Sequence, residues 1–232
     1  EYPSDRFILG TGACTATHGQ DEAAITLAER RARIAVAEQI RVHVWSEINT
    51  LTEDYTRTAS GKAPILGSST DIKERITTAV DLRLDGLATV DRWYSPKERT
   101  YWALAALDRA VTGRAILDEV NRSLALVEQH YQMGAERLKQ GSAFQAVNFM
   151  NQALRHAIPL INYRAQLRVV APLIAQTGDL ARSDALLKSL WRDVIVARDS
   201  LRFLVLSFNS IKLEGARQPV QVPAAHTESA LM

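Results

Sequence analysis

The hydrophobic pattern divides the chain into a first part of mixed strands and helices and a second part that is helical. Residues 6–14 predict a short strand that runs into a turn at Gly10 and Gly12. Apolar residues then recur at helical spacing from about Gln20 to Gln39. Because many of them are alanines, we expect this helix to pack closely against a sheet.

The period changes from helical to two at Ile40, where outward and inward positions begin to alternate. This alternation predicts a second strand over Ile40–Ile48 that continues toward Tyr55. Thr56–Ser69 is rich in glycine, serine, threonine and proline, which predicts a long surface loop. The pattern of Thr70–Leu82 predicts a second helix.

Two further β-like runs, Leu84–Tyr94 and Thr100–Leu107, are joined by a short charged turn that contains Pro96. This arrangement is typical of a solvent-exposed hairpin. The first domain, residues 1–112, is therefore predicted as an α+β unit with the order β-α-β-α-β-β and an antiparallel sheet.

Beyond Asp108 the apolar spacing is helical throughout. A long helix is predicted from about Ala115 to Gly141, where a glycine favours a C-terminal break. The breaks expected at Pro159 and Gly178, and a kink at Pro172, lead to three further helices. These are predicted near Ala143–Ala157, Asn162–Gln176 and Asp179–Ala197.

Part of this helical region, residues 113–199, has the spacing of a tetratricopeptide repeat (TPR). Gly134, Ala146, Met150 and Ala153 stand at its small-small-large-small positions, and Pro159 comes one place later than in that pattern. About three repeats are normally needed for an independent solenoid. A TPR-like unit and a plain pair of helical hairpins are therefore equally favoured.

The last residues, 200–232, form a third region. Ser200–Leu213 alternates in a β-like manner, and Gly215–Met232 is polar and lacks any period. The region is interpreted either as the start of a further domain or as a frayed tail.

Composition favours folded globular units and excludes several classes of function. Hydrophobic residues make up 47% and charged residues 23%, which allows a sizeable core. The net charge is only +2, and the basic residues, including the Arg30, Arg31 and Arg33 cluster, are mixed with acidic ones. Because no basic face with free aromatics emerges, binding of nucleic acid is not expected. No run approaches the roughly 20 apolar residues of a membrane span.

The single cysteine, Cys14, excludes an internal disulfide. A lipid-attachment cysteine would follow an apolar stretch, whereas Glu1–Arg6 is polar. We therefore interpret Cys14 as a small buried hydrophobe at a strand end.

No constellation of residues predicts a catalytic, cofactor-binding or metal site. The five histidines lack metal-ligand spacing, and Gly10-Thr11-Gly12 lacks the third glycine of a dinucleotide-binding loop. Neighbouring carboxylates such as Asp118 and Glu119 diverge along a helix and cannot act as a pair. The prediction is a protein that is not an enzyme and has no cofactor.

The densest aromatic group consists of Trp93, Tyr94, Tyr101 and Trp102, on either side of the hairpin turn. Packing across the hairpin is favoured over a binding ridge, but exposed aromatics would be the obvious hot spot. With Met150, these four are the candidate interaction residues.

Several motifs occur in a characteristic order within residues 1 to about 120. They are Tyr2-Pro3, Arg6-Phe7, Gly10-x-Gly12, Leu84-Asp85-Gly86-Leu87, Asp91-Arg92-Trp93-Tyr94 and Tyr101-Trp102-Ala103-Leu104-Ala105-Ala106-Leu107-Asp108-Arg109. In these motifs the chain resembles the Lpp-twenty family of bacterial lipoproteins, some of which are linked to flagella. The N-terminal domain of the flagellar H-ring protein has a similar fold.

The resemblance implies an exported protein in the periplasm, tethered to the outer membrane by a lipid anchor upstream of Glu1. It carries over no catalytic residues. The leading hypothesis is a non-enzymatic envelope scaffold or assembly subunit that contacts other envelope proteins or copies of itself. One alternative is a helical-repeat adaptor that captures peptides in a groove around Met150. A second is a small-ligand receptor or enzyme with its site between the two halves.

Overall fold

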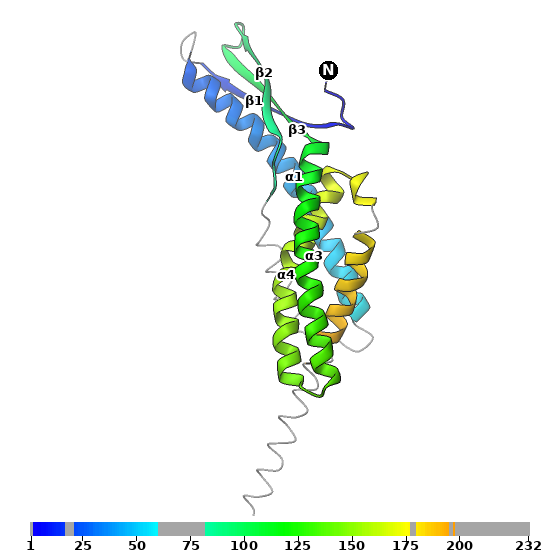
Figure 1. Cartoon of the computed structure of the whole chain (residues 1–232). Helices are drawn as coiled ribbons and strands as arrows, with labels where there is room; N and C mark the ends of the chain where they lie inside the picture. The colour runs from blue at the N-terminus through cyan, green and yellow to red at the C-terminus, as the bar shows by residue number, and fades with distance from the viewer. Residues whose placement is uncertain (1, 17–20, 60–81, 177–179, 195–196, 198–232) are drawn as a thin grey trace, which may run out of the picture.

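The computed structural model describes residues 2–16, 21–59, 82–176, 180–194 and 197. A small sheet stands at one end of an elongated helical bundle, and one long helix runs along both (Figure 1). The elements in chain order are β1 (Phe7–Thr15), α1 (Glu22–Ala59), β2 (Leu87–Ser95), β3 (Thr100–Asp108), α3 (Arg109–Lys139), α4 (Ala143–Val170) and the 3-10 turn η1 (Ile174–Gln176). Residues 180–194 are also helical. The architecture is mixed helix and antiparallel sheet, as the sequence predicted.

The sheet has the strand order β1-β3-β2, and both pairings are antiparallel. β1 pairs with β3 in unbroken register from Phe7 opposite Asp108 to Thr15 opposite Thr100. β2 and β3 form the predicted hairpin, with a bulge between Thr89 and Asp91. The first strand and the hairpin predicted from sequence are therefore confirmed.

The turn predicted at Gly10 and Gly12 is wrong, because β1 continues through both glycines. A Cβ atom on Gly10 would lie 2.6 Å from the carbonyl oxygen of Ala32. On Gly12 it would lie 2.1 Å from the carbonyl oxygen of Ala28. The two glycines thus let the backbone of α1 approach the backbone of β1, and the close packing of an alanine-rich helix on the sheet is confirmed.

The strand predicted over Ile40–Ile48 is also wrong, because these residues lie in the middle of α1. Val42, which a strand would bury beside Ile40, is 68% exposed. No glycine or proline interrupts Glu22–Ala59, so nothing in the sequence ends the helix at residue 40. Burial instead recurs every four residues, at Ala24, Ala28, Ala32, Val36, Ile40, Val44 and Ile48.

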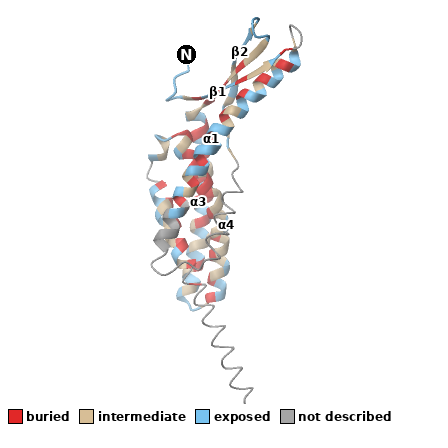
Figure 2. Ribbon diagram, turned by 180° about the vertical axis from the view of Figure 1, so that it is seen from behind, coloured by how far each residue is buried: buried red, intermediate tan, exposed pale blue. Residues whose placement is uncertain are grey.

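This four-residue repeat winds around α1. Each step of four residues turns the buried stripe by about 40°, or about 240° from Ala24 to Ile48. The N-terminal half of α1 therefore faces the sheet, and the C-terminal half faces α4 with a different side of the helix. Figure 2 shows the buried positions following α1 from the sheet into the bundle.

α3 and α4 form an antiparallel hairpin whose link contains Gly141 with a positive φ of 76°. The long helix predicted up to Gly141 is confirmed.

The break predicted at Pro159 is wrong, because α4 continues through this proline. The predicted kink at Pro172 is also wrong, because this residue lies beyond the end of α4. α4 is the central helix of the bundle: every residue from 160 to 167 except Tyr163 is buried. Packing on several sides compensates for the missing N–H of the proline.

Buried residues of the sheet, of α1 and of the bundle form one hydrophobic cluster. The helix predicted near Asp179–Ala197 is found over the described residues 180–194. Residues 56–59 of the predicted loop belong to α1. The rest of that loop, residues 70–81 of the helix predicted over Thr70–Leu82 and the β-like segment at 200–213 lie outside the described residues.

Candidate functional site

One face of the sheet is covered by α1, and the other carries exposed apolar side chains. Ala103, Ala105 and Leu107 of β3 alternate toward α1 and are buried. Among the described helices, only α1 packs across the sheet. The side chains on the opposite face, here called the open face, include Leu9, Thr11, Ala13, Trp93, Trp102 and Leu104, and the exposed Asp91 lies opposite Leu104 on the same face.

The four hairpin aromatics come together as two cross-strand pairs on opposite faces. Trp93 and Trp102 stack on the open face, with ring centroids 6.0 Å apart and an interplanar angle of 5°. Tyr94 and Tyr101 meet at 4.7 Å on the side of α1, where Tyr101 packs against the core. The hairpin therefore uses all four residues for packing, but only the tryptophans contribute to the open face.

The open face has the chemistry of a protein contact surface. Trp93 is 44% exposed and Leu9 is exposed as well, while Trp102 and Leu104 are half-buried. Exposed tryptophan beside aliphatic side chains is typical of interaction hot spots, where desolvating a large ring stabilises a complex.

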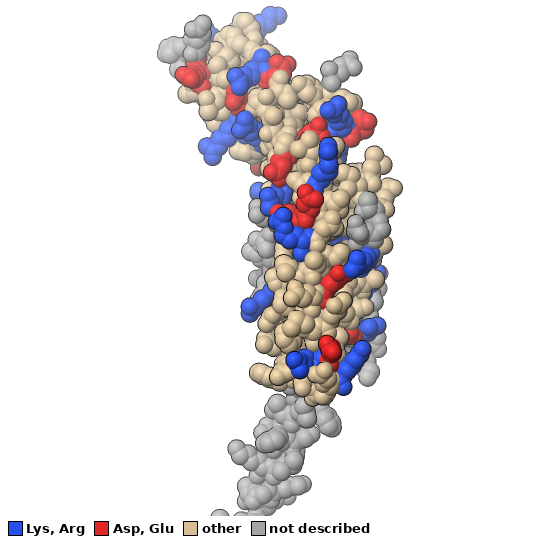
Figure 3. Space-filling view, in the orientation of Figure 1, with Lys and Arg blue, Asp and Glu red and all other residues tan. Residues whose placement is uncertain are grey.

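Arg31 and Arg33 of the basic cluster are exposed and reach the two edge strands. Arg31 donates from Nη1 to the carbonyl oxygen of Ala13 on β1, at 2.5 Å. Arg33 donates from Nε to the hydroxyl oxygen of Thr89 on β2, at 3.3 Å. Figure 3 shows positive and negative side chains interspersed over one face of the molecule. These arginines help to hold α1 on the sheet.

Met150 lies in the core and not on a surface. It is 1% exposed, between α4 and α3, and a Cβ atom on Gly134 would lie 2.8 Å from its Cγ atom. Ala146 and Ala153 are buried in the same helix. The small-small-large-small spacing therefore reflects helix packing, and a partner cannot reach Met150 in this fold.

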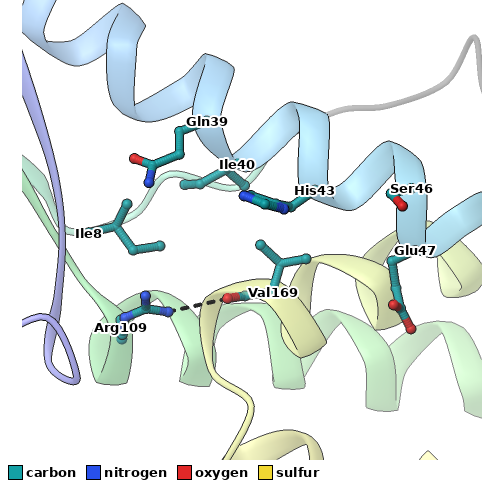
Figure 4. Close-up of a pocket in the computed structure, with 8 residues that line it drawn as sticks. All are labelled: Ile8, Gln39, Ile40, His43, Ser46, Glu47, Arg109 and Val169. Atoms are coloured by element: carbon teal, nitrogen blue, oxygen red, sulfur yellow. Dashed lines mark hydrogen bonds between the residues drawn. The ribbon is translucent and has the colours of Figure 1, made fainter.

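A pocket of about 400 Å³ lies where the sheet meets the bundle (Figure 4). It is called the junction pocket below. Its lining comes from β1, α1, the first residue of α3 and the end of α4: Ile8, Gln39, Ile40, His43, Ser46, Glu47, Arg109 and Val169. The sequence offered no signal for it, because its residues are distant along the chain.

Arg109 owes its position in this pocket to the direct passage of β3 into α3. Asp108 caps α3 by accepting hydrogen bonds from the backbone N–H groups of Ala110 at 2.9 Å and Val111 at 3.1 Å. These bonds, chiefly that from Val111, lower the pKa of Asp108. A capped helix start leaves no loop between strand and helix, so Arg109 is rigidly placed.

The Arg109 guanidinium joins three segments. Its Nε donates to the carbonyl oxygen of Ser4 at 3.1 Å, and its Nη1 donates to those of Val169 at 3.2 Å and Val170 at 2.8 Å. The last two are among the terminal carbonyls of α4, which a cation stabilises. Burial lowers the pKa of Arg109, and the charge of Asp5 acts in the opposite direction.

Potential metal ligands are sparse in the described part of the chain. It contains no group of three or more histidine, cysteine, aspartate or glutamate side chains that could hold a metal ion.

His130 of α3 and His156 of α4 stack with their ring centroids 5.3 Å apart. Burial, and secondarily His130, lower the pKa of His156. Cys14 is half-buried near the end of β1 and packs against the core.

In the described ranges, no helix combines the length and the hydropathy that a membrane span requires. No protein-family model and no curated protein matches this chain. The resemblance to the Lpp-twenty family therefore stays a prediction.

Proposed function

We propose that this chain is a non-enzymatic scaffold or assembly subunit that binds other proteins through the open face of its sheet. The location that goes with this proposal is the bacterial cell envelope, in the periplasm at the outer membrane. That location and the lipid anchor rest on the sequence resemblance alone. The partners are other envelope proteins or further copies of the chain.

The observation that carries the proposal is the stacked pair of Trp93 and Trp102 on the open face. Stacking holds both indoles in place before a partner arrives, so little side-chain entropy is lost on binding. Leu9 and Leu104 extend the apolar surface across the neighbouring strands. A rigid apolar surface of this kind favours contact with a second protein over chemistry on a small substrate.

The test compares two exposed tryptophans. Trp93→Arg places a charge on the open face, whereas Trp45→Arg makes the same change on α1, where Trp45 is 53% exposed. Hot-spot residues contribute about 2 kcal/mol or more to binding, so Trp93→Arg should weaken partner binding by roughly thirtyfold. Trp45→Arg should leave it unchanged.

Light scattering after size exclusion measures self-association of the full chain. A photo-crosslinking residue at position 93, followed by mass spectrometry of the crosslinked species from envelope extract, identifies another partner. A lone wild-type monomer that crosslinks to nothing would contradict the proposal. Equal losses for the two arginine variants would also contradict it.

A helical-repeat adaptor is the second candidate, favoured by the way α3 and α4 pack. A Cβ atom on Gly134 would lie 2.8 Å from the Cγ atom of Met150 and 3.2 Å from the carbonyl oxygen of Ala146, so α4 approaches α3 closely at this glycine. Such an approach is what the small residues of the TPR-like spacing would serve. The partner would then contact the outer surface of the bundle, where Phe144 is 77% exposed. Loss of partner binding in Phe144→Asp, with normal binding in Trp93→Arg, would favour this adaptor over the sheet-face scaffold.

A further inference from the structure

The junction pocket combines a cation with an apolar wall. Figure 4 shows Gln39, Ile40 and His43 of α1 on one side and Arg109 and Val169 on the other. A volume of about 400 Å³ falls within the range of small-molecule sites. The pocket can therefore hold a small molecule with one charged end and one apolar end.

We propose that the junction pocket binds a small organic monocarboxylate, with Arg109 as the cation that receives the carboxylate. This ligand site is separate from the open face, and it stands or falls independently of the scaffold function.

Within the described part of the chain, the charge of Arg109 is balanced by carbonyl dipoles and not by a paired carboxylate. Among the described residues, no carboxylate lies within ion-pair distance of its guanidinium; Asp5 acts only at longer range. The neighbouring carboxylates are already paired with other arginines. Asp108 pairs with Arg6 at 3.6 Å, and Glu47 pairs with Arg168.

The guanidinium also keeps donors for a ligand. Of its five N–H groups, three donate to the carbonyl oxygens of Ser4, Val169 and Val170. The other two belong to Nη2, which has no hydrogen-bond partner among the described residues. Charge-assisted bonds from arginine to carboxylate are stronger than neutral ones.

The rest of the lining selects the kind of carboxylate. Ile8, Ile40 and Val169 form an apolar wall, which suits a short hydrocarbon chain. The amide of Gln39 can donate a further hydrogen bond to the bound carboxylate. Glu47 adds a negative charge to the lining, and this disfavours ligands with two or more negative charges. The preferred ligand is therefore a monoanion with an aliphatic body.

Hexanoate is the probe, and titration of the full chain at pH 7 by calorimetry is the measurement. For a ligand of this size we expect saturable 1:1 binding with a Kd on the order of 1 mM. Hexan-1-ol and hexylammonium keep the hydrocarbon but lose the negative charge, and inorganic phosphate keeps the charge but lacks the hydrocarbon. Each should bind at least tenfold more weakly than hexanoate.

Substituting Arg109 would also remove its bonds to Ser4 and α4, so the informative variant is Gln39→Glu. It places a carboxylate across the pocket from Arg109 and leaves every described bond of Arg109 intact. We expect it to weaken hexanoate binding at least tenfold. The matched control is Gln132→Glu, the same change at an exposed position of α3.

Three results would overturn the proposal. They are no saturable binding of hexanoate up to about 10 mM, equal binding of hexanoate and hexan-1-ol, and unchanged binding in Gln39→Glu. The arginine variants at Trp93 and Trp45 should both bind hexanoate like the wild type, which keeps this test separate from that of the open face.

Discussion

The two halves of α1 pack by opposite means. Toward its N-terminus the buried side chains are alanines, and they meet the glycines of β1 so closely that the two backbones touch. Toward its C-terminus the buried side chains are Ile40, Val44 and Ile48, which fill the space to the neighbouring helices. The N-terminal half is stabilised by small residues that allow close backbone contact with β1. The C-terminal half is stabilised by large side chains that pack against the neighbouring helices.

This difference shows how one helix joins a sheet to a bundle. Small residues allow a helix to approach a strand that has no side chain on the facing side. Branched residues keep a helix at the distance that side chains require, 8–10 Å or so between axes. The two halves should therefore respond to substitution in opposite ways: added volume damages the first, and removed volume damages the second.

Adding volume to the sheet contact should have the largest effect. In Gly12→Val the new Cβ would lie 2.1 Å from the backbone oxygen of Ala28, so α1 must move away from β1. We expect a loss of about 3 kcal/mol or more in the free energy of unfolding, measured by chemical denaturation.

Thr11→Val is the matched control, because Thr11 immediately precedes Gly12 in β1 and its exposed side chain lies on the open face. Its effect should stay within about 0.5 kcal/mol. If Gly12→Val unfolded at the same denaturant concentration as Thr11→Val, the close contact between β1 and α1 would be refuted.

Removing volume from the bundle contact should come next. Ile48 is fully buried, and Ile48→Ala should lower the free energy of unfolding by about 3 kcal/mol, through lost burial and a residual cavity. Val42→Ala, at an exposed position of the same helix, should change it by less than about 0.5 kcal/mol.

This pair of variants also tests whether residues 40–48 form a helix or a strand. In a strand, positions 42 and 48 share one face, so both substitutions would be costly. In a helix only Ile48 points inward. Similar losses for the two variants would argue against the continuous α1.

The smallest expected effect is a pH-dependent change in the free energy of unfolding that arises at the contact between α3 and α4. Burial and His130 lower the pKa of His156 below the value of about 6.5 expected in the unfolded chain. The folded state then binds fewer protons, so this contribution to stability is present above about pH 6.5 and is lost as the pH falls through the folded pKa.

His156→Gln should reduce the difference in the free energy of unfolding between pH 7.5 and pH 5.5. Ile48→Ala, which changes no titratable group, should shift the free energy equally at both pH values. An unchanged pH dependence in His156→Gln would exclude His156 as a source of acid sensitivity.

Much of the fold could be predicted from local signals. The β2–β3 hairpin has two apolar runs around a charged turn with Pro96, and the end of α3 is marked by Gly141. Both depend on residues that are neighbours in sequence. Pro159 shows the limit of such signals, because a proline that breaks an isolated helix is tolerated in α4, where the surrounding bundle holds the chain on both sides.

The candidate sites were predictable only in part. Clustering of the hairpin aromatics was visible in the sequence, but the pattern did not show that the two tryptophans lie on the open face and the two tyrosines beside α1. Met150 has the sequence spacing of a TPR-like repeat, but it is buried in the core and cannot contact a partner protein. Arg109 ends one of the motifs that carry the family resemblance and Gln39 lies in none, but nothing in the sequence linked either residue to a ligand, so the junction pocket had no sequence signal.

The sequence by itself determined the mixed first part, the helical second part and the strands of the hairpin, because hydrophobic period and turn residues act over a few positions. Only the tertiary structure decided what the ambiguous residues 40–48 became. Alternation and a four-residue repeat both place Ile40, Val44 and Ile48 together, and the bundle that packs against them selects the helix. The open face and the junction pocket were likewise decided by packing, because each is built from segments that meet only after the chain has folded.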